Sequence, residues 1–183
     1  MNYLIIHGIQ GRAGKHWQQW LHDQLLSMQH QVIMETYPNP DHPERLEWLE
    51  TAKKSIATIP TENLVIITHS LGAVTALDLI ENLSGTIHGL VTVAGFYRDY
   101  GAELNSYFLS SHNINIAEVK KKILKKAVIF FGDDDPYVPQ VELHALAEGL
   151  ETEPIIIPAG GHLNTESGFV EFPLLLEKCL QLA

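Results

Sequence analysis

The chain has 183 residues, of which 45% are hydrophobic and 19% are charged. This is the composition of a globular domain with a full core, and we expect one domain over residues 1–183. The formal net charge of −10 argues against a nucleic-acid-binding protein, which needs a basic face, and disfavours an anionic membrane as partner.

The single cysteine, Cys179, rules out an intramolecular disulfide framework and is expected to pack as a small apolar residue. The sequence shows neither a basic leader followed by an apolar stretch nor a run of about 18 apolar residues. We therefore expect a cytoplasmic protein.

Short apolar runs rich in β-branched residues predict six strands, at 3–6, 32–34, 64–67, 89–94, 127–131 and 154–157. Apolar residues at helical spacing predict helices at 17–28, 46–59, 73–80, 116–125, 140–150 and 172–182. Apolar strands that alternate with helices predict a three-layer α/β fold, a doubly wound parallel sheet covered on both faces. Ligands bind such sheets beyond the carboxyl ends of the strands, so the loops there hold the candidate site.

The first of these loops, His7–Gly14, is rich in glycine. Its backbone is expected to donate an N–H to an oxyanion, that of Ile9, with Gly8 allowing close approach of substrate. A phosphate-binding loop is the alternative. The stretch lacks the G-x-G-x-x-G spacing and a P-loop lysine–serine pair, which argues against that alternative.

The third predicted strand runs into Thr68-His69-Ser70-Leu71-Gly72 and then a helix. A serine at a sharp strand-to-helix junction is typical of a nucleophile elbow, although Thr68 replaces the first glycine of the usual signature. The N–H of Leu71 would then be the second oxyanion donor. A helix N-cap is the simpler interpretation of Ser70 alone, and His69 is expected to pack in the elbow and border the substrate.

The stretch 95–115 after the fourth strand is irregular and rich in aromatic residues. Phe96 and Tyr97 are candidates for substrate contacts, and Tyr97, Tyr100, Tyr107 and Phe108 could line an acyl or leaving-group pocket. Ordinary loop packing explains these aromatic residues equally well.

A serine nucleophile needs a base, and the base needs an orienting acid. Gly161-His162 follows the sixth strand, and Asp133-Asp134-Asp135-Pro136 follows the fifth, which gives the chain order Ser…Asp…His of α/β-hydrolases. We favour Asp135 as the acid because Pro136 stiffens the loop that would aim it. Asp133 and Asp134 remain alternatives, with polar turn residues as their simpler interpretation.

These motifs resemble the α/β-hydrolase superfamily and, within it, the small serine hydrolases of the retinoblastoma-binding protein 9 family. The resemblance rests on His7-Gly8 with His16-Trp17 and Trp20, on His69-Ser70-Leu71-Gly72, on Asp135-Pro136 with Val138-Pro139, and on Gly161-His162. It implies a compact fold with strand order 2-1-3-4-5-6 and no substantial lid. It also implies that Ser70, Asp135 and His162 form the catalytic triad.

The sequence therefore predicts a serine hydrolase that cleaves a small ester, thioester or amide through an acyl-enzyme on Ser70. A carboxylesterase is the main expectation, with amidase or aminopeptidase activity as alternatives. The only partner expected is a small acyl substrate, with no metal or organic cofactor, and the chain is expected to be a monomer or weak dimer. A catalytically silent fold that serves as a protein-binding module is the competing hypothesis.

Overall fold

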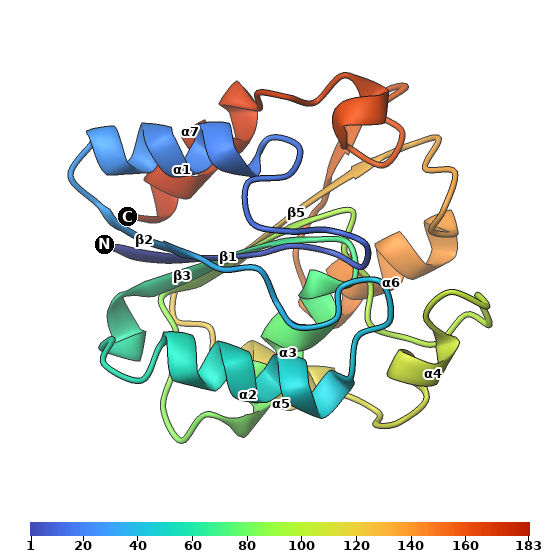
Figure 1. Ribbon diagram of the computed structural model, residues 1–183, viewed down its shortest axis with the longest axis horizontal. Helices are drawn as coiled ribbons and strands as arrows, with labels where there is room; N and C mark the ends of the chain where they lie inside the picture. Colours follow the sequence, from blue (N-terminus) through green and yellow to red (C-terminus); the bar gives the residue numbers. More distant parts are fainter.

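A six-stranded parallel sheet crosses the middle of the computed structural model, which describes residues 1–183 (Figure 1). Its strand order is β2-β1-β3-β4-β5-β6, which confirms the order expected from the resemblance. The strands are β1 (Asn2–Ile6), β2 (Gln31–Met34), β3 (Leu64–His69), β4 (Gly89–Val93), β5 (Ala127–Gly132) and β6 (Ile155–Ile157).

Neighbouring residues of the central strands point to opposite faces of this sheet. In β3, Leu64 and Ile66 join one buried apolar cluster, whereas Val65 and Ile67 join the other. Because helices cover both faces, every position of the strand is shielded from water, and the run is apolar throughout instead of alternating.

Two layers of helices enclose the sheet. On one face lie α1 (Gln18–Ser27) and α7 (Pro173–Leu182), with the buried Cys179 on α7 (Figure 1). The other face is covered by α2 (Arg45–Ser55), α3 (Gly72–Asn82), α5 (Ile116–Lys121) and α6 (Gln140–Gly149). No helix is both long enough and apolar enough to cross a bilayer.

Three elements differ clearly from the sequence prediction. Helix α2 ends at Ser55 instead of Ile59, because residues 56–59 form turns before Pro60. Helix α5 ends at Lys121 instead of Lys125, because Ile123 forms an isolated parallel bridge with Ile87 that helical backbone cannot make. In the stretch expected to be irregular, Ser106–Leu109 forms a short helix, α4.

The α4 segment is tied to the body of the molecule by the buried Arg45 of α2. Its guanidinium donates to both carboxylate oxygens of Asp78 on α3, at 2.7 and 2.8 Å. It also donates to the backbone carbonyls of Phe108, Leu109 and His112 at 2.9–3.0 Å. Each of the three guanidinium nitrogens thus donates at least one hydrogen bond, and such hydrogen bonds are what burial of an ion pair requires.

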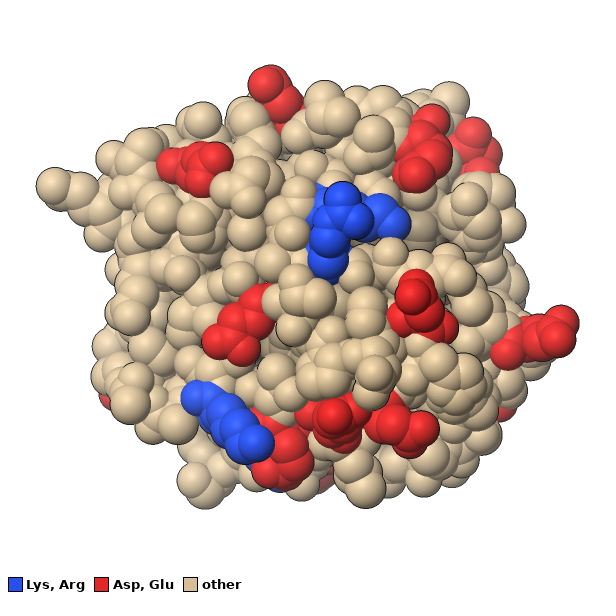
Figure 2. Space-filling view, in the orientation of Figure 1, with Lys and Arg blue, Asp and Glu red and all other residues tan.

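The surface reflects the net charge of −10. Figure 2 shows acidic side chains spread over the visible face, around a smaller group of basic side chains near its centre.

Candidate active site

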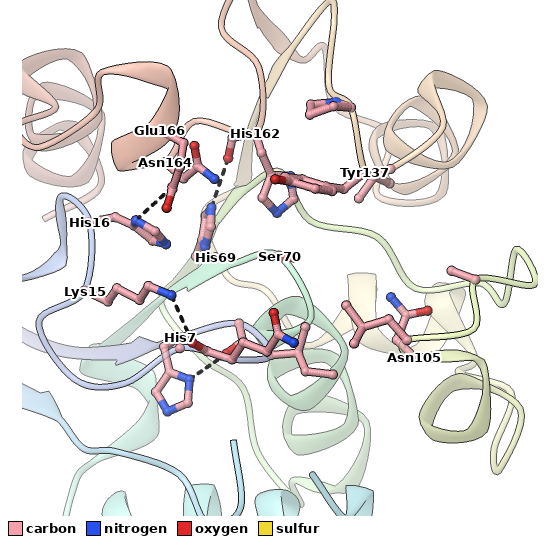
Figure 3. A pocket seen from close by; sticks show the side chains of 18 of the residues that line it. His7, Lys15, His16, His69, Ser70, Asn105, Tyr137, His162, Asn164 and Glu166 are labelled. Atoms are coloured by element: carbon pink, nitrogen blue, oxygen red, sulfur yellow. Dashed lines mark hydrogen bonds and ion pairs between the residues drawn. The ribbon is translucent and has the colours of Figure 1, made fainter. Parts of the chain in front are cut away.

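The loops after β1, β3, β5 and β6 meet at the carboxyl edge of the sheet and enclose a pocket of about 400 Å³ (Figure 3). Gly8, Ile9, His69, Ser70 and His162 all line it. The sheet topology therefore brings together residues that are up to 154 positions apart in the chain, from Gly8 to His162.

Ser70 occupies the sharp turn between β3 and α3 with a φ of 53°, in the left-handed region that non-glycine residues rarely adopt. Its backbone N–H is fixed by Val93 O at 2.9 Å. Glycine is required at position 72, because a Cβ there would lie 2.6 Å from His7 O and 2.7 Å from Ile6 O. The strained backbone at Ser70 is held by this close packing.

His162 and Asp135 form a hydrogen-bonded pair, with 2.7 Å between His162 Nδ1 and Asp135 Oδ2. The Asp135 side chain is fully buried, and its Oδ1 accepts the backbone N–H groups of Tyr137 and Val138 at 2.9 and 3.0 Å. A ring whose Nδ1–H donates to a carboxylate has Nε2 as its basic nitrogen. The structure thus places Asp135, and neither of its neighbours, against the imidazole.

The two neighbouring aspartates hold the backbone that carries His162. Asp133 accepts the N–H of Ala159 at 2.8 Å, and Asp134 accepts the N–H of Gly161 at 2.7 Å. The three consecutive carboxylates therefore bind three successive points of the loop after β6.

Two aromatic side chains fix the same loop from the α1 side. His69 Nε2–H donates to His162 O at 3.0 Å, and Trp17 Nε1–H donates to Leu163 O at 3.0 Å. Complete burial, followed by the nearby His162, keeps the pKa of His69 well below 6.5. His69 is therefore a neutral donor whose role in the structure is to support the loop.

The hydroxyl of Ser70 makes no hydrogen bond within the chain, and it faces the pocket together with the His162 ring (Figure 3). Catalytic serine–histidine hydrogen bonds commonly become short only in the substrate complex. The Tyr137 ring packs edge-on against His162, with 5.1 Å between centroids, and covers the outer side of the imidazole.

Two backbone N–H groups beside Ser70, those of Ile9 and Leu71, donate to no group of the protein. The loop after β1 lies against the elbow, because a Cβ on Gly8 would come within 2.9 Å of Ser70 Cβ. His7 shapes this loop: its Nδ1–H donates to Gly8 O at 2.7 Å, and its Nε2 accepts Tyr37 N–H at 2.9 Å. Burial lowers the pKa of His7, which suits a neutral ring with this tautomer.

The proposed contacts of Phe96 and Tyr97 with substrate need correction, since neither residue lines the pocket. The chain turns back into the core directly after β4: Phe96 is 1% exposed, and Tyr97 packs against the same core cluster. Tyr100 and Asn105 form the pocket wall instead. Of the aromatic residues considered in this stretch, only Tyr100 lines the pocket.

The sequence analysis did not identify Lys15, His16, Gln18, Tyr137 or Asn164 as pocket residues. A signal for Tyr137 exists, since it lies two residues after the candidate acid. The sequence of residues 10–18 contains no comparable indication that their side chains line the pocket.

A family model described as serine hydrolase matches residues 3–180 of the chain. The chain belongs to the serine hydrolase family. This serine hydrolase is 27% identical over 175 residues to YdeN of Bacillus subtilis (strain 168), whose name describes it as a hydrolase. The match covers 94% of this chain and 91% of YdeN.

Solved structures share the fold of this serine hydrolase. The ydeN gene product of B. subtilis superimposes with a TM-score of 0.90 at 24% identity and covers 99% of this chain and 97% of its own. Est1E of Butyrivibrio proteoclasticus gives a TM-score of 0.73 at 16% identity, over 99% and 87% of the two chains. At these identities the likeness establishes the compact α/β-hydrolase fold and leaves the substrate open.

Proposed function

We propose that this serine hydrolase cleaves small carboxylic esters, and thioesters or amides of similar size, through an acyl-enzyme on Ser70. The observation that carries the proposal is the 2.7 Å pair of Asp135 and His162 beside a serine in a left-handed elbow. A cavity of about 400 Å³ has room for a small acyl compound.

In this mechanism Ser70 Oγ attacks the acyl carbonyl while His162 Nε2 takes its proton. Asp135 holds the ring and stabilises the imidazolium, and the N–H groups of Ile9 and Leu71 donate to the oxyanion. His162 then gives the proton to the leaving group. Water, activated by the same ring, releases the acyl group and restores Ser70.

A fluorophosphonate probe tests the nucleophile, because it phosphonylates only an activated serine. We expect intact-mass analysis to show one adduct on the wild type and on Ser27→Ala, and none on Ser70→Ala. Ser27 is a matched control since its hydroxyl is exposed and bonds only to Gln24 O. Labelling of Ser70→Ala at the wild-type rate would contradict the assignment.

A wild type that stays unlabelled, while a known serine hydrolase reacts in the same tube, would favour the protein-binding module instead. For substrate class, a panel of p-nitrophenyl esters of graded acyl length, with amino-acid amides alongside, should give the highest kcat/KM on a short ester. Faster turnover of the amides would replace the esterase proposal by an amidase.

A further inference from the structure

Gln18, at the start of α1, is an unusual residue of the pocket lining. It is 1% exposed, and neither its Oε1 nor its Nε2 has a hydrogen-bond partner in the chain. Buried polar side chains are nearly always hydrogen-bonded, and leaving one unpaired is destabilising. Gln18 is a lining residue of the pocket, and a buried amide without a partner beside a pocket points to a ligand group that completes it.

His16, two residues earlier, presents a second unused donor. Its backbone is strained, with φ at 61°, and strain of this kind concentrates at functional sites. Nδ1 accepts the N–H of Thr165 at 3.1 Å, so the proton of the neutral ring is on Nε2. Burial, and then Lys15, lower the pKa of His16 to about 4. The Nε2–H is therefore a neutral donor at the pocket.

Lys15 adds a positive charge at the same place. It is the only lysine or arginine that lines the pocket, and its ammonium donates to Gln10 O at 2.9 Å, which leaves two N–H groups free. In Figure 3 its side chain extends between His69 and His7 toward the centre of the site.

We propose that Lys15, His16 and Gln18 bind a carboxylate group of the substrate. This inference rests on the proposed function and names its substrate class: esters or amides with a free carboxylate near the scissile bond. A carboxylate fits because the subsite offers a charged donor and two neutral donors, and hydrogen bonds between ionised partners are about twice as strong as neutral ones.

Two acidic residues, Glu103 and Glu166, also line the pocket. Glu166 lies 3.9 Å from His16 Nδ1, the ring nitrogen that does not carry the proton, and its side chain is 66% exposed. Glu103 is exposed and comes from the other wall. Solvent screens both charges more than it screens the partly buried Lys15.

The test compares matched substrates with and without the charge. On the acyl side these are p-nitrophenyl hydrogen glutarate and its methyl ester, and on the leaving-group side p-carboxyphenyl acetate and its methyl ester. We expect the wild type to prefer one acid over its ester by about tenfold in kcat/KM, an increment typical of one charge-assisted contact. The preferred pair shows on which side of the scissile bond the carboxylate lies.

Lys15→Met and Gln18→Leu should each remove this preference, so that the acid and its ester have nearly equal kcat/KM within the same variant. Lys53→Met is the matched control, because Lys53 lies on α2 and pairs with Glu50 away from the pocket. Equal rates for acid and ester in the wild type, or an equal loss on both in Lys15→Met, would overturn the subsite.

A binding measurement separates this subsite from the chemistry of Ser70. Calorimetry on Ser70→Ala should detect monomethyl glutarate or p-hydroxybenzoate, and a weaker or absent signal with dimethyl glutarate or methyl p-hydroxybenzoate. If fluorophosphonate labelling fails while this difference persists, the proposed function is wrong and the subsite stands. Absence of the difference in a protein that is labelled rejects the subsite alone.

Discussion

At the scale of single residues, the three aspartates after β5 have different partners and should respond differently to the same change. Asp135→Asn should lower kcat by at least about a hundredfold, because an amide cannot hold the imidazole in the required tautomer and charge. Asp133→Asn and Asp134→Asn should keep most activity, since an amide oxygen still accepts the N–H of Ala159 or Gly161. Steady-state kinetics on the three purified variants checks this prediction. A larger loss in either neighbour would transfer the role of acid to it.

Asp134 offers a sharper comparison through its bond to Gly161, the residue before the base. Asp134→Ala removes the acceptor, so we expect a lower kcat with KM nearly unchanged as His162 loses its support. Asp134→Asn should restore the rate. If Asp134→Ala and Asp134→Asn lose the same share of kcat, the carboxylate acts on the reaction through its charge and not through this hydrogen bond.

The left-handed backbone of Ser70 implies a conflict between stability and chemistry. Glycine adopts a φ of 53° without strain, so Ser70→Gly should be inactive and more stable than Ser70→Ala by about 1 kcal/mol. Thermal unfolding followed by circular dichroism should show this as a Tm about 2–4 °C higher. Equal melting temperatures would mean that the turn is not strained.

The sequence was sufficient to propose the chemistry-bearing residues, because Ser70, Asp135 and His162 each lie in the loop after a predicted strand and the hydrolase order is specific. It was insufficient for the pocket wall. Phe96 and Tyr97 were expected there from their position after β4, but where a loop turns back depends on tertiary packing. The separate roles of the aspartates were also hidden, since adjacent identical side chains differ only in direction.

At the scale of elements, Arg45 connects α2 and α3 to the chain around α4. Arg45→Met should destabilise the protein by about 3–5 kcal/mol, because Asp78 is left charged and buried. The double variant Arg45→Met/Asp78→Leu should recover much of the loss. Urea unfolding of both variants tests this, with Lys53→Met as a control on the exposed side of α2. No recovery in the double variant would assign the loss to the carbonyl contacts of Arg45.

Helices and strands were largely predictable at this scale because their apolar periodicity is strong, as in β3, where every residue is buried. The end of α5 was not, since its cause is the bridge between Ile87 and Ile123, a contact between residues 36 positions apart. The Arg45–Asp78 pair was missed for the same reason, as the two residues are 33 positions apart.

At the scale of the whole molecule, the buried neutral histidines predict loss of stability in mild acid. The pKa values of His7, His16 and His69 all lie below 6.5 in the folded protein, chiefly through burial. The unfolded chain therefore binds more protons below pH 6.5, and the free energy of unfolding falls as the pH drops from 6.5 toward about 4.

Urea titrations between these pH values should show this decrease, and His16→Asn should reduce its slope by up to about one proton. A free energy of unfolding that stays flat over the range would mean that these rings become protonated without loss of the fold. Carboxylates with lowered pKa, such as Glu81, add to the loss only at lower pH.

The manner in which Arg45 grips the α4 segment has a consequence for how new specificities can arise. All three of its hydrogen bonds there are to main-chain carbonyls, those of Phe108, Leu109 and His112, so these bonds need no particular side chain in the segment. Ala102, Glu103 and Leu104 line the pocket and make none of these contacts with Arg45, so we expect substitutions at these three positions to leave the Arg45 contacts in place. Natural divergence and laboratory grafting can both alter substrate choice at these positions without changing the loops that carry Ser70, Asp135 and His162.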